Sequence, residues 1–188
     1  VKPGYQKTKL GWIPEEWEET RLKALVDSDR KIRYGIVQPG SYDPNGRYML
    51  RGQDYSNSKG WNNPENLFRV SEEVEKKYKK ARLKGGDLVL TIVGAGTGHA
   101  QEIPSWLEGA NITQTTARIS INPKLANSKF YLYYLNSDLG KKQTYRFMKG
   151  GAQPGLNIRD VELFHLVLPP LPEQRQIARI LSTWDKAI

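Results

Sequence analysis

Residues 166–188, LVLPPLPEQRQIARILSTWDKAI, join a short apolar run to a proline cluster and an amphipathic repeat. Pro169, Pro170 and Pro172 fix φ and lack a backbone donor, so the cluster predicts a stiff spacer leading into a helix. Glu173 suits the first turn of that helix, where a carboxylate faces the positive end of the dipole.

The apolar residues behind the prolines recur every three or four positions, which is the period of one helix face. They are Ile177, Ile180, Leu181, Trp184, Ala187 and Ile188. The pattern favours a docking arm that reaches away from the domain. A terminal helix folded back on its own domain would have the same pattern, so both interpretations stay open.

Two stretches at opposite ends of the chain resemble one known family. Residues 168–181, LPPLPEQRQIARIL, are similar to the start of the conserved helical region in specificity subunits of type I restriction–modification enzymes, Pro-Pro-Leu-x-Glu-Gln-x-x-Ile. Residues 7–17, KTKLGWIPEEW, with Leu22 behind them, resemble the family's opening Gly-x-Ile-Pro-x-x-Trp. The resemblance therefore frames nearly the whole chain.

The resemblance implies a target recognition domain over residues 1–168, with a spacer and the start of a coiled-coil-type dimerisation helix over 169–188. The fold expected is α+β, a compact mixed β-sheet or barrel-like domain with peripheral helices. The subunit-docking residues expected on the helix are Leu171, Glu173, Gln174, Ile177, Ile180, Leu181, Trp184 and Ile188.

The composition bounds the partners and the chemistry. Among 188 residues, 29 Lys and Arg face 20 acids, and the net charge of +9 favours a polyanion such as nucleic acid. A basic surface without a ligand remains the alternative. No apolar run approaches the roughly 20 residues that span a bilayer, so we expect no membrane partner and a cytoplasmic location. Cysteine is absent and the two histidines lack metal-ligand spacing, which predicts no metal site.

Several loops carry polar, basic and aromatic side chains suited to DNA. Gln and Asn amides match adenine edges, and Arg matches guanine. The candidate DNA-binding residues are Lys31, Arg33, Tyr34, Gln38, Arg51, Gln53, Asn57, Lys59, Thr97, His99, Gln114, Thr115, Arg118, Lys149 and Gln153. Ordinary hydrophilic connections would have a similar composition, and this alternative stays open.

Residues 94–100, GAGTGHA, follow an apolar stretch and invite a nucleotide-binding interpretation. They lack the Gly-Lys-Ser/Thr of a P-loop and the Gly-x-Gly-x-x-Gly spacing of a dinucleotide site. A tight turn is the favoured interpretation, because glycine adopts backbone conformations that other residues avoid. Thr97 and His99 at its tip remain DNA candidates.

The coarse pattern predicts the main elements. We expect a short strand ending in a turn within 30–40, a turn feeding a buried strand within 83–93, and strands over 47–51 and 158–168. Helices are expected over 71–81, 129–135 and 140–148, and a poorly ordered segment over 1–9. Trp17, Leu22 and Leu25 are predicted burial points, His165 is predicted to be a structural strand residue, and the aromatics of 129–135 are predicted core.

No catalytic set is apparent in the sequence. An Asn/Asp-Pro-Pro-Tyr/Phe methyltransferase pocket is missing, and Asp160 and Glu162 lack the following lysine of a nuclease site. The resemblance implies a reader of one half of a bipartite DNA site. S-adenosylmethionine, ATP and Mg²⁺ would then belong to methyltransferase and restriction subunits. The chain shows no internal repeat, so a second copy or a second recognition domain would complete the site.

Two other functions remain as alternatives. One is a small enzyme acting on a phosphorylated substrate through the loop at 94–98. The other is a module that binds protein through its helix. In such a module the basic charge would be incidental.

Overall fold

The computed structural model describes residues 2–56, 59–149 and 155–187. The strands are β1 (Tyr5–Thr8), β2 (Gly11–Pro14), β3 (Glu18–Arg21), β4 (Arg33–Tyr34), β5 (Arg47–Leu50), β6 (Tyr55–Ser56), β7 (Gly60–Trp61), β8 (Arg69–Val70), β9 (Leu88–Thr91), β10 (Ala100–Glu102), β11 (Asn111–Ile112), β12 (Thr116–Ile119) and β13 (His165–Leu168). The α-helices are α1 (Leu22–Leu25), α2 (Glu72–Lys76), α3 (Ser128–Asn136), α4 (Asp138–Phe147), α5 (Ile158–Glu162) and α6 (Leu171–Ala187). Short 3-10 turns are η1 (Gly52–Asp54), η2 (Pro64–Asn66), η3 (Lys79–Ala81) and η4 (Ser105–Leu107).

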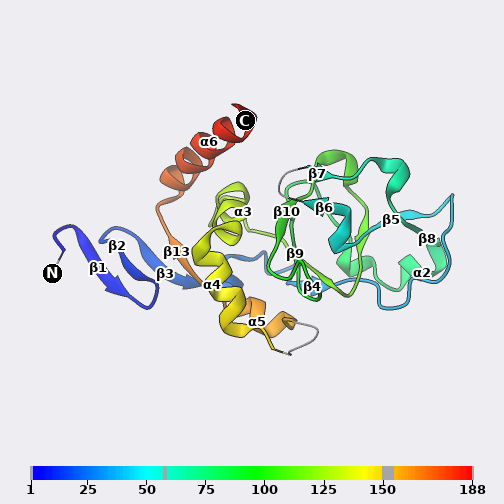
Figure 1. The fold of residues 1–188 in the computed structure, drawn as a ribbon, viewed down its shortest axis with the longest axis horizontal. Coiled ribbons are helices and arrows are strands. Elements are labelled where there is room, and N and C mark those ends of the chain that lie inside the picture. Colours follow the sequence, from blue (N-terminus) through cyan, green and yellow to red (C-terminus); the bar gives the residue numbers. More distant parts are fainter. Residues whose placement is uncertain (1, 57–58, 150–154, 188) are drawn as a thin grey trace.

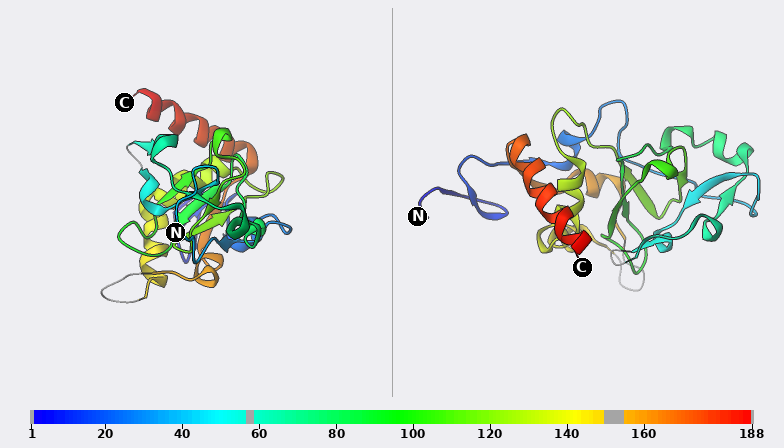
Figure 2. Two further views of the ribbon diagram at one scale, coloured as in Figure 1. Left: turned by 90° about the vertical axis from the view of Figure 1, so that its right-hand side faces the viewer. Right: turned by 90° about the horizontal axis from the view of Figure 1, so that it is seen from above.

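The molecule is elongated (Figure 1). The β1–β2 hairpin projects at one end, β5, β8 and α2 form the other end, and α3 and α4 lie between them. The C-terminal helix α6 lies over α3 on the hairpin side of the molecule, as the two further views also show (Figure 2). Within the described ranges, no helix has both the length and the apolar character that crossing a bilayer requires.

The central strand is β9, which pairs antiparallel with β10 on one side and with β12 on the other. Leu88 and Leu90 pack in the larger apolar cluster, whereas Val89 packs in a second one. Since successive side chains of a strand point to opposite faces, β9 is covered on both sides. This explains why Leu88, Val89 and Leu90 are all apolar, without the alternation of a half-exposed strand.

The other strands form small sheets around this centre. The four-stranded sheet has the order β10-β9-β12-β4, and a three-stranded sheet has the order β11-β5-β8 with β11 parallel to β5. The remaining described strands pair as β1-β2, β13-β3 and β6-β7. The expected α+β class is confirmed, but the barrel-like alternative is wrong, because no sheet of the described residues closes on itself.

The helical predictions for 129–135 and 140–148 are confirmed as α3 and α4. Asn127 caps α3 and Ser137 caps α4, each accepting a hydrogen bond from a backbone N–H in the first turn. Phe130, Tyr131 and Tyr134 of α3 are buried in the larger cluster, so the aromatic run is core. Leu22 and Leu25 are buried and Trp17 packs against the same cluster, as predicted.

Two local predictions are wrong. The segment 1–9, expected to be poorly ordered, contains β1, which pairs with β2 in a hairpin. The short strand expected within 30–40 is confirmed as β4. The strand expected over 158–168 starts with α5, because Asn157 and Asp160 form a reciprocal capping box. The prediction for His165 is confirmed, since it lies buried in β13.

The helix predicted over 71–81 is present but shorter. Ser71 caps α2 as expected, and the chain then continues into the 3-10 turn η3. The proline link before α6 is also short. Pro169 and Pro170 alone separate β13 from α6, and Pro172 already lies in the first turn.

Candidate nucleic-acid interface

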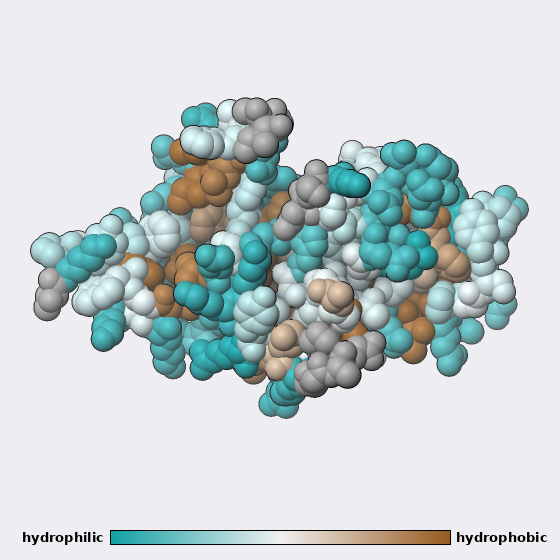
Figure 3. Space-filling model, viewed as in Figure 1, coloured by the Kyte–Doolittle hydropathy of each residue, from teal (hydrophilic) through white to brown (hydrophobic). Residues whose placement is uncertain are grey.

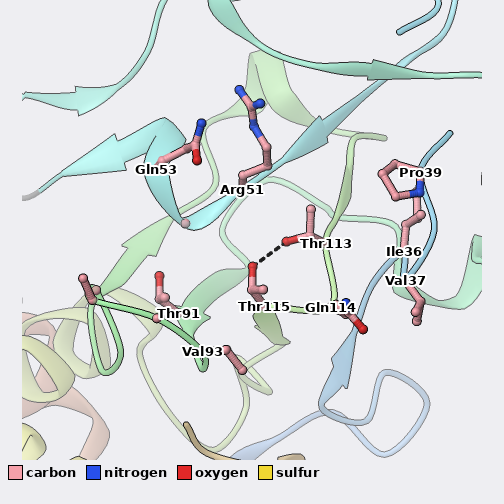
Figure 4. Close-up of a pocket in the computed structure, with 14 residues that line it drawn as sticks. Ile36, Val37, Pro39, Arg51, Gln53, Thr91, Val93, Thr113, Gln114 and Thr115 are labelled. Atoms are coloured by element: carbon pink, nitrogen blue, oxygen red, sulfur yellow. Dashed lines mark hydrogen bonds between the residues drawn. The ribbon is translucent and has the colours of Figure 1, made fainter. Parts of the chain in front are cut away.

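A cleft of about 620 Å³ lies where several polar segments meet (Figure 4). Its lining comes from the end of β5 with η1, from the turn after β9, from the β11–β12 connection, and from the residues after β4. These segments are far apart in the sequence and are joined by strand pairing. Four predicted DNA-binding residues converge here: Arg51, Gln53, Gln114 and Thr115.

Buried Asp54 orients Arg51 at the rim of the cleft. The Arg51 guanidinium donates from Nε at 3.1 Å and from Nη2 at 2.8 Å to the Asp54 carboxylate. The Asp54 side chain also accepts from the Arg51 backbone N–H at 2.8 Å, so one buried anion fixes both ends of this arginine. Gln53, beside it on η1, is exposed.

The backbone on the opposite wall is held rigidly while its side chains stay accessible. The N–H of Gln114 donates to the carbonyl of Ile36 at 2.9 Å, and the carbonyl of Thr115 accepts from Ile92 at 2.8 Å. The hydroxyls of Thr113 and Thr115 share a hydrogen bond at 2.8 Å, drawn in Figure 4. The side-chain amide of Gln114 is therefore exposed, while its backbone is held in place by hydrogen bonds.

The chemistry of this cleft suits the edges of nucleobases. Gln53 and Gln114 each offer an amide with two donors and an acceptor, and Arg51 offers a guanidinium. Such groups read adenine and guanine edges, while threonine hydroxyls suit several bases. Ile36, Val37 and Pro39 add an apolar part to the lining of the cleft.

The glycine-rich turn after β9 is closed by its own backbone hydrogen bonds. The backbone N–H groups of Thr97, Gly98 and His99 donate to the carbonyls of Gly94, Thr91 and Gly96. Gly94 and Gly98 have φ of 103° and 90°, values that favour glycine. The tight-turn prediction is confirmed, and donors used internally are not available to a phosphate.

Thr97 and His99 lie on the other side of this turn. They line a separate hollow of about 230 Å³ together with Asn136, Lys141 and Tyr145. Burial lowers the pKa of His99, and the charge of Lys141 lowers it further. The turn therefore separates two polar hollows, which share Ala95 and Gly96.

The other candidates are more dispersed. Arg33 and Tyr34 are exposed on β4, and Gln38 is exposed between the cleft residues Val37 and Pro39. Lys31 lines a different hollow beside Asp27, and Lys59 is exposed at the start of β7. Lys149 is exposed and lies 3.6 Å from Asp160. Asn57 and Gln153 lie outside the described residues.

The prediction that Arg118 contacts DNA is wrong. Its side chain is 1% exposed, and its guanidinium donates to the backbone carbonyls of Lys31, Lys80 and Arg82. Burial lowers the pKa of Arg118 to about 10. The η3 turn covers the face of β12 that carries Arg118. Because η3 is distant from Arg118 in the sequence, the residues around Arg118 do not show that its side chain is buried.

The α6 residues divide into two groups. Gln174 is fully buried: its amide accepts from the backbone N–H of Asn127 at 2.9 Å and donates to the Pro169 carbonyl at 2.7 Å. Its predicted role in subunit docking is wrong, because it packs on its own domain. Leu171, Glu173 and Ile177 are partly buried, and Ile177 packs against the larger cluster.

The far half of α6 is open. Trp184 is 68% exposed, Ile180 is 48% exposed and Leu181 is 38% exposed. Apolar side chains gather over this helix in Figure 3. Ile188 lies outside the described residues.

Two groups of residues that line the two hollows were not predicted from the sequence. The apolar wall of Val37 and Pro39 carried no signal, since single apolar residues in a loop are common. Lys141 and Tyr145 had a weak signal, because they lie one helical turn apart on a basic segment. Among the residues that the structure describes, His, Asp and Glu form no group of three that could hold a metal ion.

Comparisons with known proteins identify the family of this chain. Residues 14–188 match the family described as type I restriction modification DNA specificity domain. The chain is 30% identical over 167 residues to the type I restriction enzyme EcoBI specificity subunit of Escherichia coli. It is 29% identical over 194 residues to the putative type I restriction enzyme MjaX specificity subunit of Methanocaldococcus jannaschii.

These matches cover 89% and 98% of this chain, but 34% and 43% of the relatives. The chain thus spans less than half the length of the relatives it matches. The HsdS subunit from Thermoanaerobacter tengcongensis superposes with a TM-score of 0.65 at 18% identity, covering 92% of this chain and 42% of that one.

A second solved structure, described as the structural basis underlying complex assembly and conformational transition of the type I R-M system, gives a TM-score of 0.67. Its identity is 18%, and the match covers 93% of this chain and 40% of that one. The chain therefore belongs to the type I restriction modification DNA specificity domain family, whose members are the non-catalytic specificity subunits of these enzymes.

Proposed function

We propose that this chain reads one half of a bipartite target in duplex DNA through the cleft that contains Arg51, Gln53, Gln114 and Thr115. The observation that carries the proposal is the convergence of these four base-reading side chains from separate segments onto one cleft. The net charge of +9 supplies the general attraction to the phosphate backbone. Sequence preference would come from the amides and the guanidinium.

The rigid backbone of the cleft supports base reading. Because Gln114 and Thr115 are anchored through their backbone groups, little conformational freedom is lost when a base edge binds. Asp54 orients Arg51 before any ligand arrives. A phosphate-substrate enzyme is less well supported, since the glycine turn uses its own donors internally.

Selection from randomised duplexes tests this proposal. The wild-type chain should enrich one short sequence, and Gln114→Ala and Gln53→Ala should each relax the preference at one position. Loss of a bidentate contact costs about 1–3 kcal/mol, which corresponds to roughly 5- to 150-fold in discrimination. Gln176→Ala, an exposed glutamine on α6, is the matched control and should leave the selected sequence unchanged.

A selection that enriches no sequence from the wild-type chain would refute this proposal. Enrichment that is identical for wild type, Gln114→Ala and Gln53→Ala would place the reading surface elsewhere.

We also propose that the exposed half of α6 docks methyltransferase subunits and, through them, the restriction subunit. Ile180, Leu181 and Trp184 present an apolar stripe of the kind that packs against another helix. The same stripe suits a second recognition domain or a second copy, and a pair of copies would read a two-fold site. S-adenosylmethionine, ATP and Mg²⁺ would be bound by the partner subunits in a cytoplasmic assembly.

A further inference from the structure

The outward side of α4 is a basic surface that the base-reading cleft does not use. Lys141, Lys142, Tyr145 and Arg146 are all exposed, and Tyr145 is 67% exposed. They form two rows, with Lys141 one turn before Tyr145 and Lys142 one turn before Arg146. Hydrophilic side chains cover this part of the molecule in Figure 3.

This surface lies directly beside the glycine turn that borders the cleft. A Cβ at Gly98 would lie 2.7 Å from the Thr144 side chain, so the turn packs tightly on α4. Lys141 and Tyr145 line the smaller hollow, which shares Ala95 and Gly96 with the cleft. The α4 surface is therefore separated from the cleft by the width of one turn.

Several contacts hold α4 rigidly in this place. Asn136, at the end of α3, pairs with both the N–H and the carbonyl of Ala100 at 3.0 Å. Gln143 accepts a hydrogen bond from the backbone N–H of His165 at 3.1 Å. A Cβ at Gly140 would lie 2.3 Å from the Leu135 carbonyl oxygen, so the two helices meet at backbone contact.

The charge of this surface is not neutralised locally. Residues 138–149 contain Asp138 as their one acid against four cations. Among the described residues, no carboxylate lies within 4.0 Å of Lys141, Lys142 or Arg146. In contrast, Lys76 of α2 lies 3.4 Å from Glu72. Unpaired cations on a rigid helix are suited to a regularly spaced polyanion.

We propose that Lys141, Lys142 and Arg146 bind the phosphodiester backbone of the DNA strand whose bases enter the neighbouring cleft. This inference rests on the proposed function and adds the element that positions the duplex. Base contacts in the cleft supply preference, and phosphate contacts on α4 set the register and orientation. Tyr145, which lines the smaller hollow together with Lys141, can donate its hydroxyl to a phosphate or sugar oxygen.

The salt dependence of binding tests this assignment. The variant Lys141→Ala/Lys142→Ala/Arg146→Ala should bind the selected duplex and a scrambled duplex more weakly by the same factor. The slope of log affinity against log salt should become shallower by about 0.9 for each phosphate contact removed. The matched control Lys7→Ala/Lys9→Ala/Lys124→Ala removes the same charge from exposed positions on the hairpin and before α3. It should leave the slope close to that of the wild-type chain.

The outcomes separate this inference from the proposed function. The α4 variant and the control could show the same slope of log affinity against log salt, while Gln114→Ala still alters the preferred bases. This result would overturn the α4 assignment and leave the proposed function standing. A change of preferred bases in the α4 variant would also overturn it, because α4 would then read bases. Weakened binding of a methyltransferase subunit with DNA binding intact would assign the surface to protein instead. If the α4 variant unfolds, Lys141→Gln/Lys142→Gln/Arg146→Gln, which keeps long polar side chains, replaces it.

Discussion

The indole N–H of Trp17 donates a hydrogen bond to the Glu173 carboxylate at 2.9 Å, which joins the two ends of the chain across 156 positions. Gln174 next to it is buried against Asn127 and Pro169. One end of α6 is thereby built into the recognition domain.

A second contact holds α6 further along its length. The hydroxyl of Tyr133 donates to the Asp185 carboxylate at 2.6 Å. Burial raises the pKa of Tyr133, and this hydrogen bond raises it further. Of the two interpretations of the terminal helix, the folded-back one is right for Gln174 and Ala178, while Trp184 remains open to a partner. The domain therefore sets the direction of the helix, and the exposed stripe points away from it.

Gln174→Ala should destabilise the chain. The substitution leaves the Asn127 N–H and the Pro169 carbonyl without their partner in a buried site. Unsatisfied buried groups cost about 1–3 kcal/mol each, so the free energy of unfolding should fall by about 3 kcal/mol. Urea denaturation measures the change. Gln176→Ala, on the exposed side of the same helix, should change it by less than about 0.5 kcal/mol. Equal effects would mean that the Gln174 contacts contribute little.

Leu181→Ala/Trp184→Ala should weaken assembly and leave the fold intact. Both side chains are more than a third exposed, so their truncation removes few internal contacts. We expect at least a tenfold loss of affinity for the methyltransferase subunit, measured by calorimetry, with an unchanged unfolding midpoint. The control Arg179→Ala, exposed on the same helix, should bind normally. Loss of the fold in the double variant would instead assign this half of α6 to the core.

Glu75 gives a prediction about pH. Its buried carboxylate accepts two hydrogen bonds from Arg82 and one from Asn111. The Arg82 hydrogen bond is the main cause that lowers the pKa of Glu75 below its usual 4.5. A lowered folded-state pKa means stability that is fully present above pH 4.5 and is lost as the pH falls through the folded value.

Glu75→Gln should therefore lower the free energy of unfolding by about 3 kcal/mol at pH 7, because it leaves Arg82 without its buried anion. The difference between the two proteins should begin to shrink as the pH falls below 4.5, where Glu75 of the unfolded chain takes up a proton. It should be lost below the folded-state pKa, where Glu75 is uncharged in both states. Urea denaturation from pH 7 to pH 3 measures it. If the difference in the free energy of unfolding stays constant from pH 7 to pH 3, the Glu75–Arg82 ion pair does not cause it.

Gly35→Ala should disrupt the wall of the cleft. A Cβ at Gly35 would lie 1.7 Å from the Ile112 carbonyl oxygen, where no side chain fits. The backbone of residues 35 and 36 must then move away from the segment that carries Gln114. This movement should lower the free energy of unfolding by about 3 kcal/mol. Gly85→Ala, whose Cβ would meet its nearest atom at 3.6 Å, is the control and should be nearly neutral. Thermal unfolding would measure the loss of stability, and the affinity for the duplex would measure the damage to the cleft.

Local patterns predicted the elements that depend on short-range chemistry. The Ser71 cap of α2, the helical spacing of the aromatics in α3, the apolar run of β9 and the glycines of the turn after it were all correctly interpreted. The placement of Gln114 in the same cleft as Arg51 could not be predicted, because it depends on the parallel pairing of β11 with β5. The predictions for Arg118 and Gln174 were wrong because their burial also depends on contacts between distant parts of the chain. Distant segments cover them, and neither residue type usually indicates a buried position.

Site-specific cross-linking tests the central claim most directly. Because the chain has no cysteine, Gln114→Cys introduces a single thiol into the cleft. We expect it to form a disulfide with a thiol-tethered base in the selected duplex, and to do so at least tenfold faster than Lys7→Cys on the distant β1–β2 hairpin. Equal rates at the two positions, or cross-linking at position 7 alone, would contradict recognition through this cleft.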